Sequence, residues 1–401
     1  MKILMLSWEY PPKSVGGLST HVYYLAHELY KLGHEVHLIT CEEGTAPKEE
    51  NDKGVHVYRV EPFSLETDDF TKWVMQLNLA MIVVGTKIIQ EKGPFHIIHS
   101  HDWLTSYGSI TLKLAHDIPL VCTIHATEYG RNNGIKTEMQ RYISSTEWML
   151  CFESWKIIVC SDYMKKQVGD IFHIPTDKIK VIPNGVNSDE FEFIADLKEF
   201  RSNYAAEDEK IVFYIGRHVF EKGIHLLVEA ANKIVDGYQK TKFIIGGRGP
   251  MTEELKDRVE KMGLSPKFEF LGYMEDEVRN KLYRVSDVAA FPSLYEPFGI
   301  VALEAMSAGC PVVVSDTGGL SEIVQHEITG LKCFTGSPES LVENILKILR
   351  DEGLGKVIKE NALKEIHEKY TWNKIAANTV EVYKAVISEA TGTKWDIKDK
   401  D

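Results

Sequence analysis

Two cations near each other are the first feature of the sequence that could do chemistry. Arg217 and Lys222 lie in the glycine-bounded segment 216–223 (GRHVFEKG), directly after the apolar run Ile211–Ile215. Arginine offers a planar fork and lysine a point charge, and together they suit the oxygens of a diphosphate. The alternative is a solvated loop pair, and the segment alone does not decide between the two.

A second segment combines two carboxylates with a helix start. Residues 293–304 (SLYEPFGIVALE) follow a predicted strand, and a helix is expected to begin near Gly299. Its free backbone N–H groups would face an anion. Glu296 and Glu304 are unusual beside a phosphate, but they fit if they accept hydroxyl protons from a sugar or a ribose. For Glu304 alone, the alternative is a solvated helical position.

Glycine pairs follow two of the predicted strands. Gly16 and Gly17 lie between the first strand and the first helix, and Gly318 and Gly319 follow a later strand. Glycine there lets the backbone approach a phosphate or a sugar, although a plain turn is the alternative. Neither pair forms the GxGxxG fingerprint, so a nicotinamide is not indicated and no cofactor is expected.

Histidines and a carboxylate follow two other strands. Residues 99–103 (HSHDW) contain Asp102, and residues 123–131 (TIHATEYGR) contain His125. These spacings match no helical zinc motif, so the sequence predicts no metal site. A histidine at a strand end is usually structural. We expect a functional role for His125 only because it would face the phosphate cluster across a cleft.

Short β-branched strands alternate with amphipathic helices along the chain, which is typical of a doubly wound parallel sheet. The pattern starts twice. The strands of the first half are predicted at 3–6, 36–39, 97–98, 120–124, 157–159 and 181–182, and those of the second half at 211–215, 243–245, 268–271, 288–291 and 312–314.

The two halves predict two Rossmann-like domains. The first spans residues 1–190 and is joined by a C-terminal helix at 372–390, the charged segment 191–209 is a linker, and the second domain spans 210–371. A cleft between such domains is the natural ligand site.

Composition narrows the class of protein further. The chain has 401 residues and a formal net charge of −13, which disfavours general nucleic-acid binding. The six cysteines show no CxxC spacing and fit a reducing cytosol, so we expect a cytoplasmic protein. The longest apolar stretch, near residues 79–84, is short for a membrane span. The DxD at 399–401 is expected to be a solvated tail, and the sequence leaves open whether the chain forms a homo-oligomer.

Taken together, these residues resemble the glycogen-synthase-like branch of the retaining GT-B glycosyltransferases, known as family four. The resemblance covers nearly the whole chain, from residue 7 to residue 372. Its most diagnostic pieces are residues 15–18 (VGGL), 101–103 (HDW), 123–128 (TIHATE), 216–223, 296–304 and 317–319 (TGG). It implies a GT-B fold, in which two Rossmann-like domains have parallel sheets facing across a cleft.

The resemblance also implies a role for each matching position. The catalytic set would be His125 beside the donor sugar, Arg217 and Lys222 on the leaving diphosphate, and Glu296 on the sugar hydroxyls. Glu304 would hold the ribose, Tyr273 would line the base pocket, and Glu9 and Asp102 would shape the acceptor side. Backbone groups would complete the donor site at Gly16, Gly17, Phe298, Gly299, Ile300, Gly318 and Gly319.

The implied reaction moves a hexose, with glucose favoured, from ADP- or UDP-glucose to an α-glucan or another sugar, with retention and without a metal. Ser14 and Ala126 depart from starch and glycogen synthases, which commonly carry a lysine and an asparagine there. The segment 125–131 looks more like the shorter α-1,4-glucan glucosyltransferases. The alternatives are a mannosyl- or sucrose-phosphate-synthase-like transferase, a nucleotide-sugar 2-epimerase and a non-catalytic nucleotide-sugar binding protein.

Overall fold

The computed structural model describes residues 1–63, 69–192 and 197–396. The DxD at 399–401 and part of the predicted linker lie outside these residues. The chain divides into two compact units. Unit 1 comprises Met1–Asn184 and Trp372–Asp401, and unit 2 comprises Gly185–Thr371.

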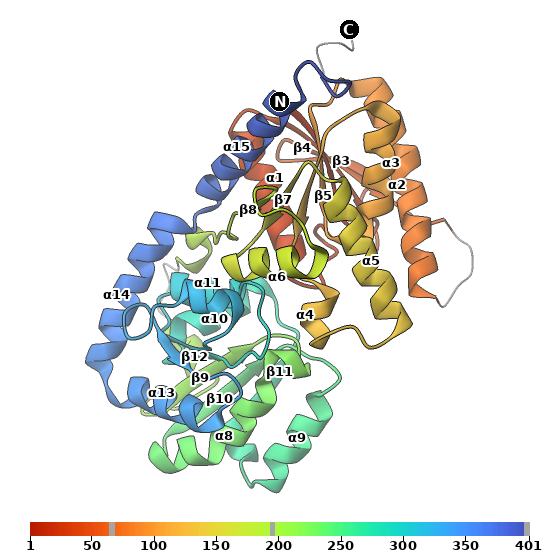
Figure 1. The fold of residues 1–401 in the computed structure, drawn as a ribbon. Coiled ribbons are helices and arrows are strands. Elements are labelled where there is room, and N and C mark those ends of the chain that lie inside the picture. Colours follow the sequence, from red (N-terminus) through yellow and green to blue (C-terminus); the bar gives the residue numbers. More distant parts are fainter. Residues whose placement is uncertain (64–68, 193–196, 397–401) are drawn as a thin grey trace. The chain divides into compact units, whose positions relative to one another are not determined.

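Unit 1, whose sheet lies between helices in Figure 1, has eight strands in the order β3-β4-β2-β1-β5-β6-β7-β8. All neighbours are parallel except the edge pair β3 and β4. The strands are β1 (Lys2–Leu6), β2 (Glu35–Cys41), β3 (Glu49–Asp52), β4 (Val55–Val60), β5 (Ile97–His101), β6 (Leu120–Ile124), β7 (Lys156–Val159) and β8 (Ile179–Val181). The sequence did not predict β3 and β4. Strand β3 is short and polar, and β4 follows it directly after a turn.

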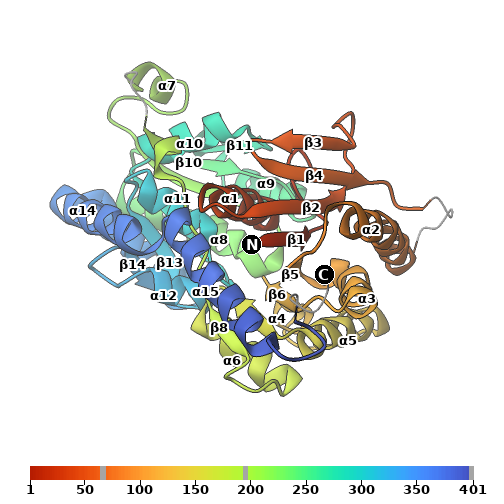
Figure 2. The ribbon, with the colours of Figure 1, turned by 90° about the horizontal axis from the view of Figure 1, so that it is seen from above.

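Helices cover both faces of this sheet. Helices α1 and α15 pack together on one face, where Tyr24 stacks on Trp372, and helices α2, α3 and α5 lie on the other (Figure 2). The helices of unit 1 are α1 (Gly17–Lys31), α2 (Phe70–Lys92), η1 (Trp103–Thr105), α3 (Ser106–His116), α4 (Glu128–Asn132), α5 (Glu138–Glu153), α6 (Asp162–Phe172) and α15 (Trp372–Ala390).

Helix α2 is longer and more apolar than the sequence analysis expected. Among the described residues, it is the one helix long and apolar enough to cross a membrane. Within unit 1, Val74, Leu77 and Met81 of its inner face are buried. Gly85 lies where a side chain would collide with Leu112 of α3, so the two helices are closely packed. The helix therefore forms part of the core of unit 1.

Unit 2 contains a six-stranded parallel sheet with the order β11-β10-β9-β12-β13-β14. Its strands are β9 (Lys210–Ile215), β10 (Thr241–Gly246), β11 (Phe268–Gly272), β12 (Val288–Phe291), β13 (Val312–Ser315) and β14 (Leu331–Cys333). Its helices are η2 (Ser188–Phe191), α7 (Lys198–Ser202), η3 (Phe220–Lys222), α8 (Ile224–Gly237), α9 (Thr252–Lys261), η4 (Ser265–Lys267), α10 (Asp276–Val285), α11 (Ile300–Ser307), α12 (Gly318–Ile323), α13 (Pro338–Arg350) and α14 (Glu352–Lys369).

The unit boundary differs from the predicted linker. The described part of segment 191–209 belongs to unit 2, and the boundary lies earlier, between Asn184 and Gly185. The segment also contains a short helix, α7, whose Arg201 is paired with Asp287 at 3.2 Å. A charged segment without strand pattern is therefore packed onto unit 2, because its side chains find ionic partners there.

Candidate functional site

The predicted phosphate-binding residues of unit 2 lie at the carboxyl ends of adjacent strands. The strand order reverses between β9 and β12, and doubly wound sheets bind ligands at such a switch point. Arg217 and Lys222 follow β9, Glu296 follows β12, and Gly318 follows β13. The sheet therefore brings together segments that are up to about a hundred residues apart in the sequence.

Glycines allow the loops after these strands to touch. A Cβ on Gly223, which has φ +66°, would lie 1.8 Å from the carbonyl oxygen of Pro292. A Cβ on Gly318, with φ +52°, would lie 2.0 Å from the carbonyl oxygen of Glu296. The N–H of Gly319 donates to that same carbonyl at 2.9 Å. Glycine is thus required at these positions by close backbone contact as well as by positive φ.

Lys222 and Glu296 form the centre of this loop cluster. The Lys222 ammonium donates to both carboxylate oxygens of Glu296, at 2.9 and 2.7 Å, and the Ser293 hydroxyl donates to one of them at 3.2 Å. Arg217, whose side chain is 53% exposed, contacts Glu221 at 3.3 Å. Because an ammonium has three donors, Lys222 keeps one for a further acceptor.

Helix α11 begins beside this ion pair. Gly299 is its N-cap with φ +111°, Ile300 is its first residue, and Phe298 directly precedes the cap. The N–H groups of Gly299 and Ile300 belong to the start of the helix. Such groups lack acceptors inside the helix and carry a partial positive charge. The loop cluster therefore presents N–H dipoles next to a lysine and an arginine, which is an arrangement suited to an anion.

Glu304 is nearly buried on the same helix and is held by two side chains that the sequence analysis did not select. The Tyr283 hydroxyl donates to its carboxylate at 3.0 Å, and the Arg279 guanidinium lies 3.8 Å away. Burial, aided by the charge of Glu304, raises the pKa of Tyr283 well above its ordinary value. Tyr273, after β11, is 66% exposed, with the Arg248 guanidinium 5.9 Å from its ring centre.

In unit 1, the loop after β1 is organised by Glu9. Its carboxylate accepts the N–H groups of Val15 and Gly16, at 2.8 and 3.1 Å. The pKa of Glu9 is raised, chiefly by burial. Gly17 is the first residue of α1. The N–H of Gly16 is therefore used within the loop, and Gly17 opens the helix.

Asp102 and His125 lie together after the neighbouring strands β5 and β6. The Asp102 carboxylate accepts the backbone N–H of His125 at 2.8 Å, and Asp102 itself has φ +59°, which is strained for a residue with a side chain. Burial raises the pKa of Asp102 to about 6. Burial, aided by the charge of Arg131, lowers the pKa of His125 to about 3, so its imidazole is neutral.

Three further histidines surround His125. The ring centre of His21, from α1, is 4.6 Å from that of His125, and the ring of His101 is 5.6 Å away. His99 lies behind His101 at 4.2 Å. One signal in the sequence could have pointed to His21, because this polar residue lies on the apolar face of its helix with Leu18, Val22 and Leu25.

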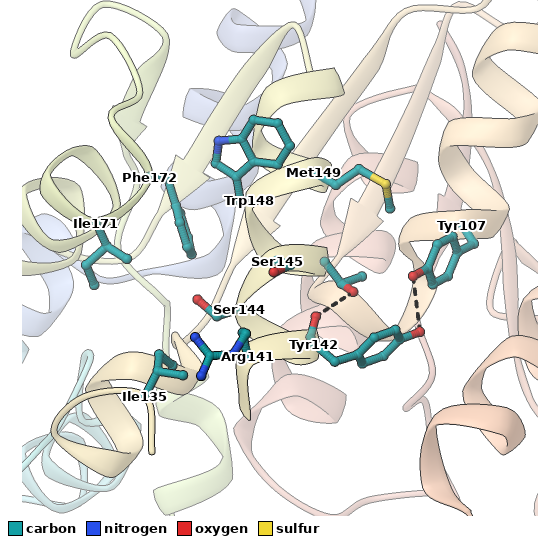
Figure 3. A pocket seen from close by; sticks show the side chains of 11 residues that line it. Tyr107, Ile135, Arg141, Tyr142, Ser144, Ser145, Trp148, Met149, Ile171 and Phe172 are labelled. Atoms are coloured by element: carbon teal, nitrogen blue, oxygen red, sulfur yellow. Dashed lines mark hydrogen bonds between the residues drawn. The ribbon is translucent and has the colours of Figure 1, made fainter. Parts of the chain in front are cut away.

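A separate hollow of about 590 Å³ lies on unit 1 around α5 (Figure 3). The Tyr107 and Tyr142 hydroxyls at its edge are hydrogen-bonded at 3.1 Å, and Trp148 and Phe172 are also among its lining residues. None of the predicted site residues lines this hollow. The hollow is therefore separate from the predicted site residues.

The fold and the strand-end loops define an α/β protein with two doubly wound units, and comparisons with known proteins identify the class. The Glycosyltransferase Family 4 model matches residues 15–190, and the Glycosyl transferases group 1 model matches residues 196–365. An uncharacterized glycosyltransferase of Methanocaldococcus jannaschii is 40% identical over 392 residues, which are 96% of this chain and 98% of that protein.

Two further relatives narrow the family. The glycogen synthase of Mycobacterium tuberculosis is 32% identical over 399 residues, covering 96% of this chain and 95% of that protein. The solved sucrose-phosphate synthase of Thermosynechococcus elongatus has a TM-score of 0.85 and 23% identity, covering 97% and 99% of the two chains. The chain belongs to the glycogen- and starch-synthase-like glycosyltransferases, which have the GT-B fold.

Proposed function

We propose that this glycosyltransferase moves glucose from ADP- or UDP-glucose to an α-glucan or another sugar, with retention of configuration. The observation that carries the proposal is the loop cluster of unit 2, where Arg217, Lys222 and the start of α11 meet Glu296. The glycogen synthase relative supports glucose and an α-glucan. A mannosyl- or sucrose-phosphate-synthase-like activity is the competing assignment.

In the proposed reaction, the bond between the anomeric carbon and the diphosphate oxygen breaks while a bond to the acceptor oxygen forms on the same face. The proton of the acceptor hydroxyl passes to the departing diphosphate. Arg217, Lys222 and the N–H groups at the start of α11 stabilise the negative charge that develops, so no metal is required.

The remaining site residues also have a place in this proposal, in which Tyr273 lines the pocket for the base. Glu296, freed from Lys222 when the ammonium turns to the diphosphate, accepts sugar hydroxyls, and Glu304 accepts those of the ribose. His125 is placed beside the donor sugar, and its neutral imidazole supports a hydrogen-bonding rather than an ionic role. The backbone at Gly16, Gly17, Gly318 and Gly319 permits close approach of the donor. Glu9 and Asp102 shape the acceptor side.

The cellular setting is part of the proposal. We infer a cytoplasmic enzyme that binds a nucleotide sugar and a carbohydrate. All six cysteines are buried and free of disulfides, which supports a reducing compartment.

A matrix of donors and acceptors tests the assignment. ADP-glucose, UDP-glucose, GDP-mannose and UDP-N-acetylglucosamine are each offered with a short α-glucan, glucose or a sugar phosphate, and released nucleotide is measured. We expect release with ADP- or UDP-glucose and the glucan, and an α-linked product by NMR. Release with GDP-mannose alone would overturn the glucose assignment. Conversion of a donor in the absence of any acceptor would favour an epimerase.

A further inference from the structure

The histidines of unit 1 form a cluster that the proposed transfer reaction does not need. His21, His101 and His125 come from α1, β5 and the loop after β6, and their ligand-capable nitrogens all lie within 4.8 Å of one another. His21 and His101 are buried, and His125 is partly exposed. We propose that His21, His101 and His125 form a binding site for a divalent transition metal such as zinc.

The nitrogen geometry fits such an ion. His101 Nδ1 and His125 Nε2 are 3.3 Å apart. Two tetrahedral ligands that are each about 2.0 to 2.1 Å from one zinc ion are separated by roughly 3.3 Å. The ring of His21 is edge-to-face to that of His125, with centres 4.6 Å apart, and its ligand nitrogen lies within 4.8 Å of the other two. Coordination by all three histidines requires a side-chain rotation that brings this nitrogen closer.

The hydrogen bonds leave a lone pair on His21 for this purpose. Its Nδ1–H donates a hydrogen bond to the Asn184 amide oxygen at 2.6 Å, so Nε2 is the unprotonated nitrogen of the neutral ring. Nε2 is buried and has no hydrogen-bond partner among the described residues. A ligand histidine whose other nitrogen donates to an oxygen is the usual arrangement around a metal.

His99 supports the cluster from outside it. Its two ring nitrogens contact the Tyr383 and Thr123 hydroxyls at 2.6 and 2.8 Å, so it has no free lone pair for an ion. Neutral imidazoles are the form that binds zinc, copper or nickel.

The remaining coordination position would open toward His125, the most exposed ligand, and a water would fill it. An ion there holds the His125 imidazole that the proposed function places beside the donor sugar. Zinc should therefore inhibit sugar transfer, and this consequence, unlike the binding itself, rests on the proposed function.

Cobalt(II) tests the binding without reference to activity. The full-length chain, stripped with a chelator, is titrated with Co²⁺ while the visible absorption of tetrahedral cobalt is followed. We expect about one equivalent to bind and zinc to displace it. His21→Gln should weaken Co²⁺ binding by at least about tenfold. His125→Asn should weaken Co²⁺ binding to the same extent. Because the His125 side chain is partly exposed, this variant keeps the test valid if His21→Gln fails to fold.

A second cluster provides the matched control. Glu35, His37 and His56 also lie close enough to share an ion. His56→Gln should leave Co²⁺ binding unchanged. Absence of the tetrahedral absorption, or its loss in His56→Gln instead of His21→Gln, would overturn the proposed site.

The transfer assay separates the two proposals. Zinc sensitivity is measured relative to the metal-free activity of each variant, with chelator reversal. We expect wild type to be inhibited, and His21→Gln to need at least about tenfold more zinc. Binding without inhibition would contradict the placement of His125 in the reaction while leaving the metal site intact.

Discussion

In unit 2, charged residues after the strands and on helices α10 and α11 are held in pairs, whereas in unit 1 burial shifts the pKa values of several titratable residues toward their neutral forms. Lys222 contacts Glu296 through two hydrogen bonds, and Arg279 lies near Glu304. In unit 1, His125 is neutral and burial raises the pKa of Glu147 to about 8. The same central strand order thus carries charged pairs in unit 2 and titratable groups shifted toward their neutral forms in unit 1.

The largest effect is expected from removing a charge in unit 2. Lys222→Ala should lower kcat for sugar transfer about 10²- to 10³-fold, because a preorganised donor to the leaving diphosphate is lost. Lys233→Ala is the matched control, since Lys233 pairs with Glu339 on the exposed surface of the same unit. Near-wild-type turnover of Lys222→Ala, with folding verified by circular dichroism, would show that the diphosphate is bound elsewhere.

The next effect is on stability and tests whether the loop contacts of unit 2 are structural requirements. Gly318→Ala should cost roughly 3 kcal/mol or more, because positive φ and a backbone collision act together. Gly263 has φ +70° but open space around it, so Gly263→Ala should cost only about 1 to 2 kcal/mol. Thermal unfolding compares the two, and equal losses would contradict the required close contact.

A smaller, pH-dependent effect tests the neutral character of unit 1. A carboxyl whose pKa is raised from 4.5 unfolded to about 8 folded contributes stability at low pH, which is lost as pH rises between those values. Glu147→Gln mimics the protonated form and should raise the melting temperature relative to wild type more at pH 8 than at pH 5. Its Oε1 can still accept the Glu128 N–H.

The control for this measurement lies on the same helix. Glu138, at the start of α5, has a side chain that is 90% exposed. Glu138→Gln should shift the melting temperature equally at both pH values. If Glu147→Gln also shifts the melting temperature equally at pH 5 and pH 8, Glu147 is charged in the folded protein. Unit 1 would then lack the neutral carboxyl that distinguishes it from unit 2.

The smallest effect is expected at the proposed base pocket. Tyr273→Ala should raise KM for the donor about 2- to 10-fold with little change in kcat, because one stacking contact of about 0.5 to 1.5 kcal/mol is lost. Val357→Ala, at another exposed apolar position of unit 2, is the control. A fall in kcat with an unchanged KM would assign Tyr273 to another role.

Much of the fold could be predicted because buried parallel strands leave a strong local signal. The runs that became β1, β6, β9 and β12 are short, apolar and followed by glycine, proline or polar residues. The ends of β9 and β12 also located Arg217, Lys222 and Glu296. The β3–β4 hairpin escaped because its first strand, Glu49–Asp52, is polar and lies at the sheet edge.

The interactions between distant segments could not be predicted. Lys222 and Glu296 are 74 positions apart, and their ion pair depends on the strand order rather than on either motif. The histidine cluster joins His21 to His101 and His125 through three different elements, so a rule based on local spacing finds no metal site there. Glu147 was missed because a single glutamate in an amphipathic helix normally faces solvent.

The return of the C-terminal helix to unit 1 has a consequence for biosynthesis. Unit 2 is one uninterrupted stretch of chain, whereas unit 1 is completed by α15, whose Trp372 stacks on Tyr24 and whose Tyr383 contacts His99. On the ribosome, unit 2 can therefore reach its final fold while unit 1 still lacks one covering helix. Helix α15 is translated after all of unit 2 and closes the apolar face of unit 1, so a chain truncated after residue 371 would leave that face open to aggregation.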